Sequence, residues 1–189
     1  MLSYEDIKAF IPNSISLLRF FLSIFFVFCI TNKLILVSLV IFIIAALTDF
    51  LDGYLARLWK VESVLGGMLD PFADKCLIIF TFITLTFYGI IPLLLTIVVV
   101  TRDLAILFVV CLCRLNNVRL EFHPLYSSKV NTTIQLLYVI LVLFCHGFMI
   151  DVPLVVYGFS LIVGVSTIFS AVQYAKKYYW IKDAICSYK

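Results

Sequence analysis

Four aspartates are the residues of this chain whose type and spacing point most directly to chemistry. They lie in the stretch TDFLDGYLARLWKVESVLGGMLDPFADK, where Asp49 and Asp52 are three positions apart and Asp70 and Asp74 are four apart. Residues at these separations lie on one face of a helix, so each pair presents its two carboxylates together. Long apolar runs flank both pairs, and ionisable side chains inside apolar membrane helices are costly and usually functional.

The depth of the two pairs follows from the apolar segments that carry them. Asp49 lies about 22 Å of helical rise beyond Leu34, and Asp74 lies about 21 Å before Tyr88. In two antiparallel helices these aspartates share one level near the cytoplasmic face of a hydrocarbon core about 30 Å thick. The other aspartate of each pair then lies about one turn nearer the cytosol, and the four acids require a water-filled cavity open to that side.

Four carboxylates this close need positive partners, because like charges raise one another's pKa. Arg57 and Lys75 are near enough in the sequence to neutralise part of the charge. Two divalent cations satisfy the acids better, and oxygen ligands beside water favour Mg²⁺ or Mn²⁺ over zinc or copper. Such ions, about 3.5–4 Å apart, clamp a phosphoryl group during its displacement. The alternative interpretation is a set of ion pairs that joins the helices.

Six apolar stretches supply the elements that position the acids, and they predict an all-α polytopic membrane protein with six transmembrane helices. The chain is 64% hydrophobic and 13% charged, whereas soluble domains carry roughly 25% charged residues. Tyr4 to Phe10 mixes apolar and charged side chains, which predicts a short N-terminal interfacial helix ending near Pro12. Residues 1–189 are expected to form a single membrane domain. The six stretches run approximately from Ser14 to Ile30, Leu34 to Thr48 with a polar extension to Arg57, Met68 to Tyr88, Ile91 to Cys113, Val130 to Phe148, and Pro153 to Tyr174.

Six spans place both termini on one side of the membrane. Lys33 is the only basic residue in the loops of the opposite side, so the positive-inside rule puts the termini and the acids toward the cytoplasm. The first ten residues, MLSYEDIKAF, lack the basic region of a signal peptide and the Arg-rich character of a transit peptide. We therefore expect a bacterial inner membrane in preference to a mitochondrial inner membrane. The cytoplasmic basic residues are Lys8, Arg57, Lys60, Arg114, Arg119, Lys129, Lys176, Lys177, Lys182 and Lys189.

The remaining polar and reactive residues do not indicate other chemistry. A net charge of +3, scattered along the chain, is too small to predict nucleic-acid binding. The six cysteines form no C-x-x-C pair and read as small apolar residues. His123 and His146 have no ligand-like neighbours, which favours structural or solvated roles.

The acid-rich stretch resembles the signature of the CDP-alcohol phosphatidyltransferase family, D-x₂-D-G-x₂-A-R-x₈-G-x₃-D-x₃-D, and meets every spacing. The resemblance implies a six-helix fold, usually homodimeric, with an active site that faces the cytoplasm. It implies that Asp49, Asp52 and Asp70 bind the metal ions. Asp74 would lie at the edge of the metal site and act as the general base toward the acceptor hydroxyl.

Small residues beside the acids leave room for a flat base or a phosphate to approach the backbone, although small residues in membrane helices also serve packing. By the same resemblance, Gly53, Ala56 and Arg57 would hold the cytidine and pyrophosphate of a CDP-linked lipid. Gly66 would line the same pocket.

Outside the signature, the chain is similar to the mitochondrial-type cardiolipin synthases over nearly its whole length. Phosphatidylglycerophosphate synthases typically read R-E in the fourth helix and G-K-x-K-T at the fifth, where this chain reads R-D from Arg102 and S-K-V-N-T from Ser128. Asn131 and Gln135, four apart on one face, either line an acceptor cavity or bridge two helices. The matching stretches are IPNSISLLR, LTDFLDGYLAR, LDPFADK, IPLLLTIVVVTRDL and PLYSSKVNTTIQL.

The S-K-V-N-T stretch lacks the second lysine of the G-K-x-K-T motif, and this difference has a physical interpretation. Glycerol 3-phosphate is a doubly charged monoester that favours several cations, whereas phosphatidylglycerol is a singly charged diester for which fewer suffice. Arg102, Lys129 and Arg119 are our candidates for the acceptor site. Lys129 could instead be an interfacial anchor, and Arg102 could instead pair structurally with Asp103.

The leading hypothesis is therefore an enzyme that makes cardiolipin and CMP from CDP-diacylglycerol and phosphatidylglycerol. Its near alternative is phosphatidylglycerophosphate synthesis from glycerol 3-phosphate. A cation transporter that uses the same aspartates is a remote alternative, because internal repeats and interrupted helices are not evident. A non-catalytic scaffold would leave the acid cluster unexplained.

Overall fold

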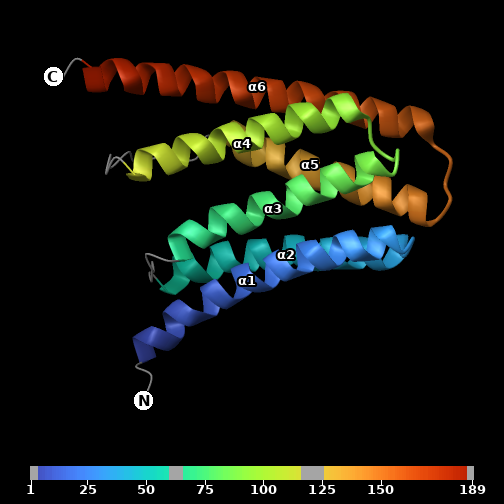
Figure 1. The fold of residues 1–189 in the computed structure, drawn as a ribbon, viewed down its shortest axis with the longest axis horizontal. Helices are drawn as coiled ribbons and strands as arrows, with labels where there is room; N and C mark the ends of the chain where they lie inside the picture. Colours follow the sequence, from blue (N-terminus) through green and yellow to red (C-terminus); the bar gives the residue numbers. More distant parts are fainter. Residues whose placement is uncertain (1–3, 60–65, 116–125, 187–189) are drawn as a thin grey trace. The chain divides into compact units, whose positions relative to one another are not determined.

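The computed structural model describes residues 4–59, 66–115 and 126–186, and side-chain surroundings for 14–48 (Ser16 excepted), 75–109 and 126–176. All regular secondary structure in these ranges is α-helical, which confirms the all-α prediction. The helices are α1 (Tyr4–Thr31), α2 (Ile35–Trp59), α3 (Gly66–Phe87), α4 (Leu93–Leu115), α5 (Tyr126–Gly147) and α6 (Pro153–Cys186) (Figure 1).

The N-terminal segment differs from the prediction. Tyr4 to Phe10 does not form a separate interfacial helix that ends near Pro12, because α1 is one continuous helix of 28 residues. A proline inside a helix removes one hydrogen bond and crowds the carbonyl four residues earlier, a cost of about 3 kcal/mol, but its φ is helical and the helix can bend there without ending. The apolar run that follows Pro12 continues the same helix.

The last helix also extends farther than its apolar stretch. α6 continues through the basic and aromatic residues after Tyr174 and ends at Cys186, which makes it a helix of 34 residues. Hydropathy marks the part of a helix that suits lipid, and the backbone can remain helical beyond that part.

The helices α1, α3 and α5 end in the same way. Lys33, Gly89 and Met149 have φ values of 60°, 71° and 55°, and each follows a helix end. In each case the next residue donates a backbone hydrogen bond five positions back, at 2.9 Å from Leu34 to Cys29, 2.9 Å from Ile90 to Leu85 and 2.8 Å from Ile150 to Cys145. This is the Schellman pattern, which satisfies carbonyls at a helix end. The breaks predicted between these pairs of helices are therefore confirmed.

The chain divides into two compact units, which we describe separately. The first contains residues 1–91 and 139–151, which include α1, α2, α3 and the end of α5. Here α1 packs against both α2 and α3. Phe26 of α1 and Phe42 of α2 meet with ring centroids 6.0 Å apart, and both side chains are fully buried. Phe82 and Leu85 of α3 are buried as well.

The second unit contains residues 92–138 and 152–189, which include α4, the first part of α5 and α6. Its helices α4 and α6 pack against each other. Tyr138 of α5 stacks on Phe159 of α6 with ring centroids 6.5 Å apart. The core of this unit also buries several polar residues, which form the network described below.

Many large apolar side chains are exposed, which suits helices surrounded by lipid. Leu154, Val165 and Phe169 of α6 and Phe21 of α1 are examples. By length and composition, α5 and the part of α6 from Pro153 to Lys176 are apolar and long enough to cross a membrane. The apolar parts found in the described ranges of α1, α2 and α3 are shorter: Leu17–Thr31, Ile35–Thr48 and Lys75–Phe87.

Candidate active site

The first unit carries the four aspartates on two helix ends. Asp49 and Asp52 lie in the last turns of α2, and Asp70 and Asp74 lie in the first turns of α3. Residues 60–65 join these two ends, so the acid-bearing parts of α2 and α3 lie at the same end of the unit (Figure 1). Because each pair belongs to an uninterrupted helix, each pair shares a helix face as predicted.

The helix bounds also give each acid a place along its helix. Asp49 lies about 15 Å of rise before Trp59, and Asp74 lies about 12 Å after Gly66. The corresponding values for Asp52 and Asp70 are about 10 Å and 6 Å. Asp49 and Asp74 therefore lie farther from the α2–α3 connection than Asp52 and Asp70, and their depth in a membrane stays a prediction.

The donor set of these four positions consists of carboxylates alone, which suits a hard cation such as Mg²⁺ or Mn²⁺. The side chains of Asp49, Asp52, Asp70 and Asp74 lie outside the described surroundings, as do those of the donor-site candidates Gly53, Ala56, Arg57 and Gly66. Among the side chains that are described, three or more histidines, cysteines or acids do not gather at any point. The residue types at these four positions of α2 and α3 thus fit the predicted metal, Mg²⁺ or Mn²⁺.

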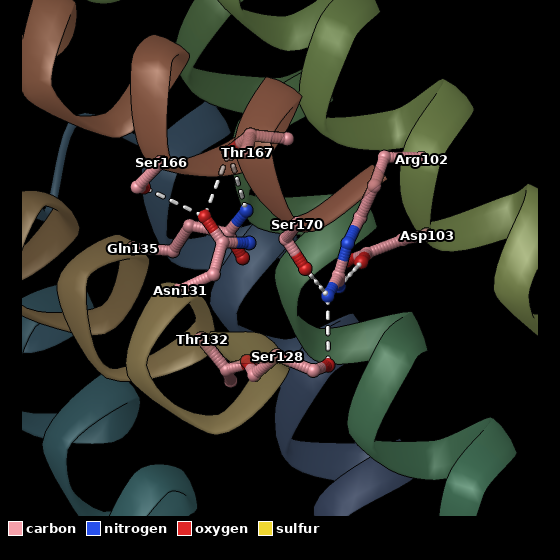
Figure 2. A network of polar contacts seen from close by, with 9 residues as sticks. All are labelled: Arg102, Asp103, Ser128, Asn131, Thr132, Gln135, Ser166, Thr167 and Ser170. Carbon is pink, nitrogen blue, oxygen red and sulfur yellow. Dashed lines mark hydrogen bonds and ion pairs between the residues drawn. The ribbon is translucent and has the colours of Figure 1, made fainter. Parts of the chain in front are cut away.

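The second unit contains a buried cation, Arg102, that is surrounded by polar partners. The Arg102 side chain on α4 is only 2% exposed, and its Nη1 lies 2.5 Å from a carboxylate oxygen of Asp103, which is fully buried. Its Nη2 donates to the hydroxyl of Ser128 on α5 at 2.7 Å and to the hydroxyl of Ser170 on α6 at 2.6 Å. Figure 2 shows the guanidinium at the point where these three partners converge. The Tyr174 ring lies 5.8 Å from its central carbon.

This geometry bears on the two interpretations of Arg102. The pairing with Asp103 is observed, and Arg102 joins α4 to both other helices of its unit. A guanidinium bound to three internal partners is fixed in position, which suits a residue that holds charge at a site. Its contact with a substrate stays a prediction.

A second polar cluster lies along α5 and α6. The Thr167 hydroxyl accepts from Nε2 of Gln135 at 3.2 Å and donates to Oδ1 of Asn131 at 3.0 Å. The Ser166 hydroxyl donates to the same Oδ1 at 2.7 Å (Figure 2). Asn131 and Gln135 therefore bridge two helices, which was one of the two predicted roles, and their side chains are almost completely buried.

The remaining acceptor candidates are less enclosed. Lys129 is exposed in the first turn of α5, beside Ser128. Ser127 donates to Oε1 of Gln173 at 2.6 Å and so ties this turn to α6. Arg119 falls within residues 116–125, outside the described part of the chain, as does His123. His146 is exposed near the end of α5.

Three polar residues of these buried sites were given no role from the sequence. Ser128 and Ser170 hold Arg102, and Arg19 of α1 is 1% exposed in the core of the first unit. Arg19 carried a visible signal, since a lone arginine in an apolar run is unusual. Ser128 appeared only as the start of the S-K-V-N-T stretch, and Ser170 carried no signal, because serine is common in membrane helices and the two lie far apart in the sequence.

Comparison with known proteins gives the class of the chain. The profile of the family described as CDP-alcohol phosphatidyltransferase matches residues 9–173. The chain belongs to this family, as the signature on α2 and α3 predicted. The family and the apolar helices together indicate a membrane protein.

Three individual proteins of known name resemble this chain. The chain is 37% identical to cardiolipin synthase (CMP-forming) of Rattus norvegicus over 153 residues, which cover 72% of this chain and 50% of the relative. It is 35% identical to cardiolipin synthase (CMP-forming) of Homo sapiens over 145 residues, covering 68% and 48%. CDP-diacylglycerol–glycerol-3-phosphate 3-phosphatidyltransferase of Cereibacter sphaeroides is 56% identical over 52 residues, covering 28% and 24%. The chain therefore spans about half the length of the two synthases.

Proposed function

We propose that this chain transfers a phosphatidyl group from CDP-diacylglycerol to the hydroxyl of phosphatidylglycerol, giving cardiolipin and CMP. The observation that carries the proposal is the complete eight-position signature, set on adjoining ends of two helices in a chain that belongs to the CDP-alcohol phosphatidyltransferase family. The choice of product is supported by likeness to two cardiolipin synthases across about seven tenths of this chain.

The donor is bound at the acid-bearing ends of α2 and α3. Asp49, Asp52, Asp70 and Asp74 would hold two divalent cations, Mg²⁺ or Mn²⁺, which would supply positive charge for the pyrophosphate. The donor's own contacts come from four further signature residues. Gly53 and Ala56 let the cytidine and pyrophosphate approach the α2 backbone, Arg57 pairs with phosphate oxygens, and Gly66 lines the same pocket.

The reaction exchanges one P–O bond for another. Asp74 accepts the proton of the acceptor hydroxyl, and the oxygen attacks the phosphorus that carries the diacylglycerol. The bond from that phosphorus to the bridging oxygen breaks, and CMP leaves with the bonding electrons. Fixed positions and charge neutralisation supply most of the rate enhancement in reactions of this kind.

The acceptor is selected by its charge. Arg102 and Lys129, with Arg119, supply positive charge for the phosphodiester of phosphatidylglycerol. Asp103 neutralises part of the Arg102 charge, which leaves a site better matched to one negative charge than to two. A monoester with two charges would favour more free cations than this unit provides.

Phosphatidylglycerophosphate synthesis from glycerol 3-phosphate is the second candidate. It is supported by likeness to enzymes named for that reaction, including the 56% identity over 52 residues. Both reactions use the same donor, so only the acceptor distinguishes them.

The setting of the enzyme is part of the proposal. All six helices cross the membrane, residues 1–189 form one membrane domain, and two chains form a homodimer. The acids and both termini face the cytoplasm, since the basic residues are concentrated in the segments expected on that side of the membrane. The host membrane is a bacterial inner membrane in preference to a mitochondrial inner membrane.

The test is CMP release by purified protein from labelled CDP-diacylglycerol with each acceptor in turn. Release that depends on phosphatidylglycerol, with labelled cardiolipin as the lipid product, is expected. Release with glycerol 3-phosphate alone would establish the second candidate. No metal-dependent release with either acceptor would contradict both.

A further inference from the structure

The first turn of α5 combines several features that favour an anion. Tyr126 begins the helix, and the backbone N–H groups of its first four residues have no partners within the helix. The positive end of the helix dipole therefore lies beside Ser128 and the exposed amine of Lys129. A helix end alone does not make a binding site, so the evidence for an anion site must come from the side chains next to it.

Arg102 supplies the second, independent observation. Its side chain is 2% exposed, yet it reaches from α4 to the first turn of α5. Both hydrogens of Nη2 are occupied by Ser128 and Ser170, and Nη1 bonds Asp103. Its Nε has no hydrogen-bond partner among the described residues. A buried cation is thus held against the helix end, but its Nη2 has no hydrogen left for a ligand.

The bonds to Asp103, Ser128 and Ser170 leave the Nε hydrogen and one Nη1 hydrogen of Arg102 unused, but both belong to a side chain that is only 2% exposed. The hydrogen of the Ser128 hydroxyl is a donor at a more accessible position. The Ser128 oxygen accepts from Arg102 at 2.7 Å, and its hydrogen donates to no other residue in the described part of the chain. Ser128 is half-buried, whereas Ser170, which accepts from the same Nη2, is fully buried. An oxygen that accepts from a charged donor becomes a stronger donor through its own hydrogen. Of the two hydroxyls, only that of Ser128 is both polarised and open to a ligand.

We infer that Ser128 contacts the acceptor's phosphate by donating its hydroxyl hydrogen to a phosphate oxygen, and that Arg102 is a positioning residue acting through Ser128. This inference rests on the proposed function for the identity of the ligand, a phosphate that carries a glycerol. It applies to a diester and to a monoester alike. Lys129, one position along the helix, adds charge at the exposed side of the same turn.

Three variants separate contact from anchoring. Ser128→Ala removes both the Arg102 anchor and the free donor, Ser170→Ala removes an equivalent anchor but no accessible donor, and Ser128→Thr keeps the hydroxyl. The probes are glycerol 3-phosphate and glycerophosphoglycerol, the deacylated headgroup of phosphatidylglycerol. Their dissociation constants are measured by titration calorimetry on the full chain in detergent, together with the KM of acceptor and donor in the CMP-release assay.

The expected result is a roughly tenfold weaker affinity for glycerophosphoglycerol in Ser128→Ala, because a hydrogen bond to a charged group is lost. The acceptor KM rises to a similar degree, and the KM for CDP-diacylglycerol is unchanged. Ser128→Thr and Ser170→Ala stay within about threefold of the unaltered chain. Glycerol 3-phosphate shows the same order of variants if it binds in the same place.

Two outcomes would overturn the inference. Equal losses in Ser128→Ala and Ser170→Ala would make Ser128 an anchor of Arg102 and nothing more. Unchanged affinity in Ser128→Ala would remove Ser128 from the site altogether. Failure of the proposed function looks different: the probes would bind in a Ser128-dependent way, while no CMP would be released with either acceptor.

Discussion

Arg102 and Asp103 are consecutive residues of α4 whose charged groups are both almost completely removed from solvent. Two such groups are tolerated when each has a partner, and removal of one partner leaves the other as an uncompensated buried charge. The hydroxyls of Ser128 and Ser170 complete the environment of the guanidinium. We therefore expect Asp103 to stabilise the buried guanidinium as well as to neutralise part of its charge.

Asp103→Leu should lower the free energy of unfolding by about 3–5 kcal/mol, because the Arg102 charge remains buried without its carboxylate. The free energy is measured by denaturant titration in mixed micelles. The double variant Arg102→Met with Asp103→Leu should recover most of the loss, since both charges are then absent. Asp151→Leu, at an exposed aspartate, is the control and should stay within about 0.5 kcal/mol. A loss as small for Asp103 as for Asp151 would show that the ion pair has no such role.

Asp74→Asn tests the proposed general base. The amide keeps the shape of the carboxylate but cannot accept the acceptor's proton, so CMP release should fall by about 10²–10⁴-fold. Metal-dependent binding of CDP should remain, because Asp49, Asp52 and Asp70 are unchanged. Asp151→Asn provides the matched substitution at an exposed position. Full activity in Asp74→Asn would eliminate the assigned base.

Sequence spacing predicted some of these residues and missed others for a physical reason. The aspartate pairs were predictable because helix periodicity places residues three or four apart on one face. The serines that hold Arg102 come from α5 and α6, at separations of 26 and 68 residues. No local pattern connects them to Arg102, so only the packing of the three helices reveals the cluster.

At the element scale, the helix connections show how the chain reverses direction. Lys33, Gly89 and Met149 all take the left-handed conformation at a helix end, although only one of them is glycine. Residues with a Cβ pay roughly 1–2 kcal/mol for this conformation, so two of the three connections retain strain. The positions of the breaks were predictable from polar residues and glycine, and the left-handed Met149 was not, because methionine carries no turn signal.

Exchanging glycine and non-glycine residues at these positions should change stability in opposite directions. Met149→Gly should raise the free energy of unfolding by about 0.5–1 kcal/mol, since strain relief exceeds the added entropy of the unfolded chain. Gly89→Ala should lower it by a similar amount. A Cβ at Gly89 would meet no atom within 4 Å, so this loss comes from the backbone alone. Thermal unfolding in detergent measures both, and changes of the same sign would contradict the turn assignment.

The bounds of α1 show where hydropathy stops being informative about an element. The mixed composition of Tyr4 to Phe10 predicted a separate helix, but the backbone continues through Pro12 to Thr31. Composition reports which solvent a segment prefers, whereas helix continuity depends on the backbone, which can stay helical through a proline at a cost of about 3 kcal/mol. The helical class was predictable because long apolar runs must satisfy their backbone groups internally.

At the scale of the whole molecule, the proposed site residues belong to two compact units. The acids lie in the unit of α1, α2 and α3, and Arg102 lies in the unit of α4 and α6, to which α5 contributes its first part. Six apolar runs predicted six helices, because each run is long enough to form one. The division into units was not predictable, because it depends on which helix faces pack together, and apolar runs in membrane helices carry little periodic signal.

The predicted orientation can be measured for the whole molecule. A cysteine in place of Lys33 should react with a membrane-impermeant maleimide added outside intact cells, whereas one in place of Lys129 should react only after the membrane is opened. The unaltered chain gives the background from its native cysteines, of which Cys29, Cys76 and Cys145 are buried. The reverse labelling pattern would place the acids on the outer face.

The proposed metal site is tested by counting metal ions at the acids of α2 and α3. Mn²⁺ is titrated into the purified chain with saturating CDP, and bound ions are quantified by electron paramagnetic resonance. We expect two Mn²⁺ per chain, with loss of ions and of CDP binding in Asp49→Asn and in Asp70→Asn. Binding of CDP without any divalent cation, or the same Mn²⁺ count in both variants, would contradict it.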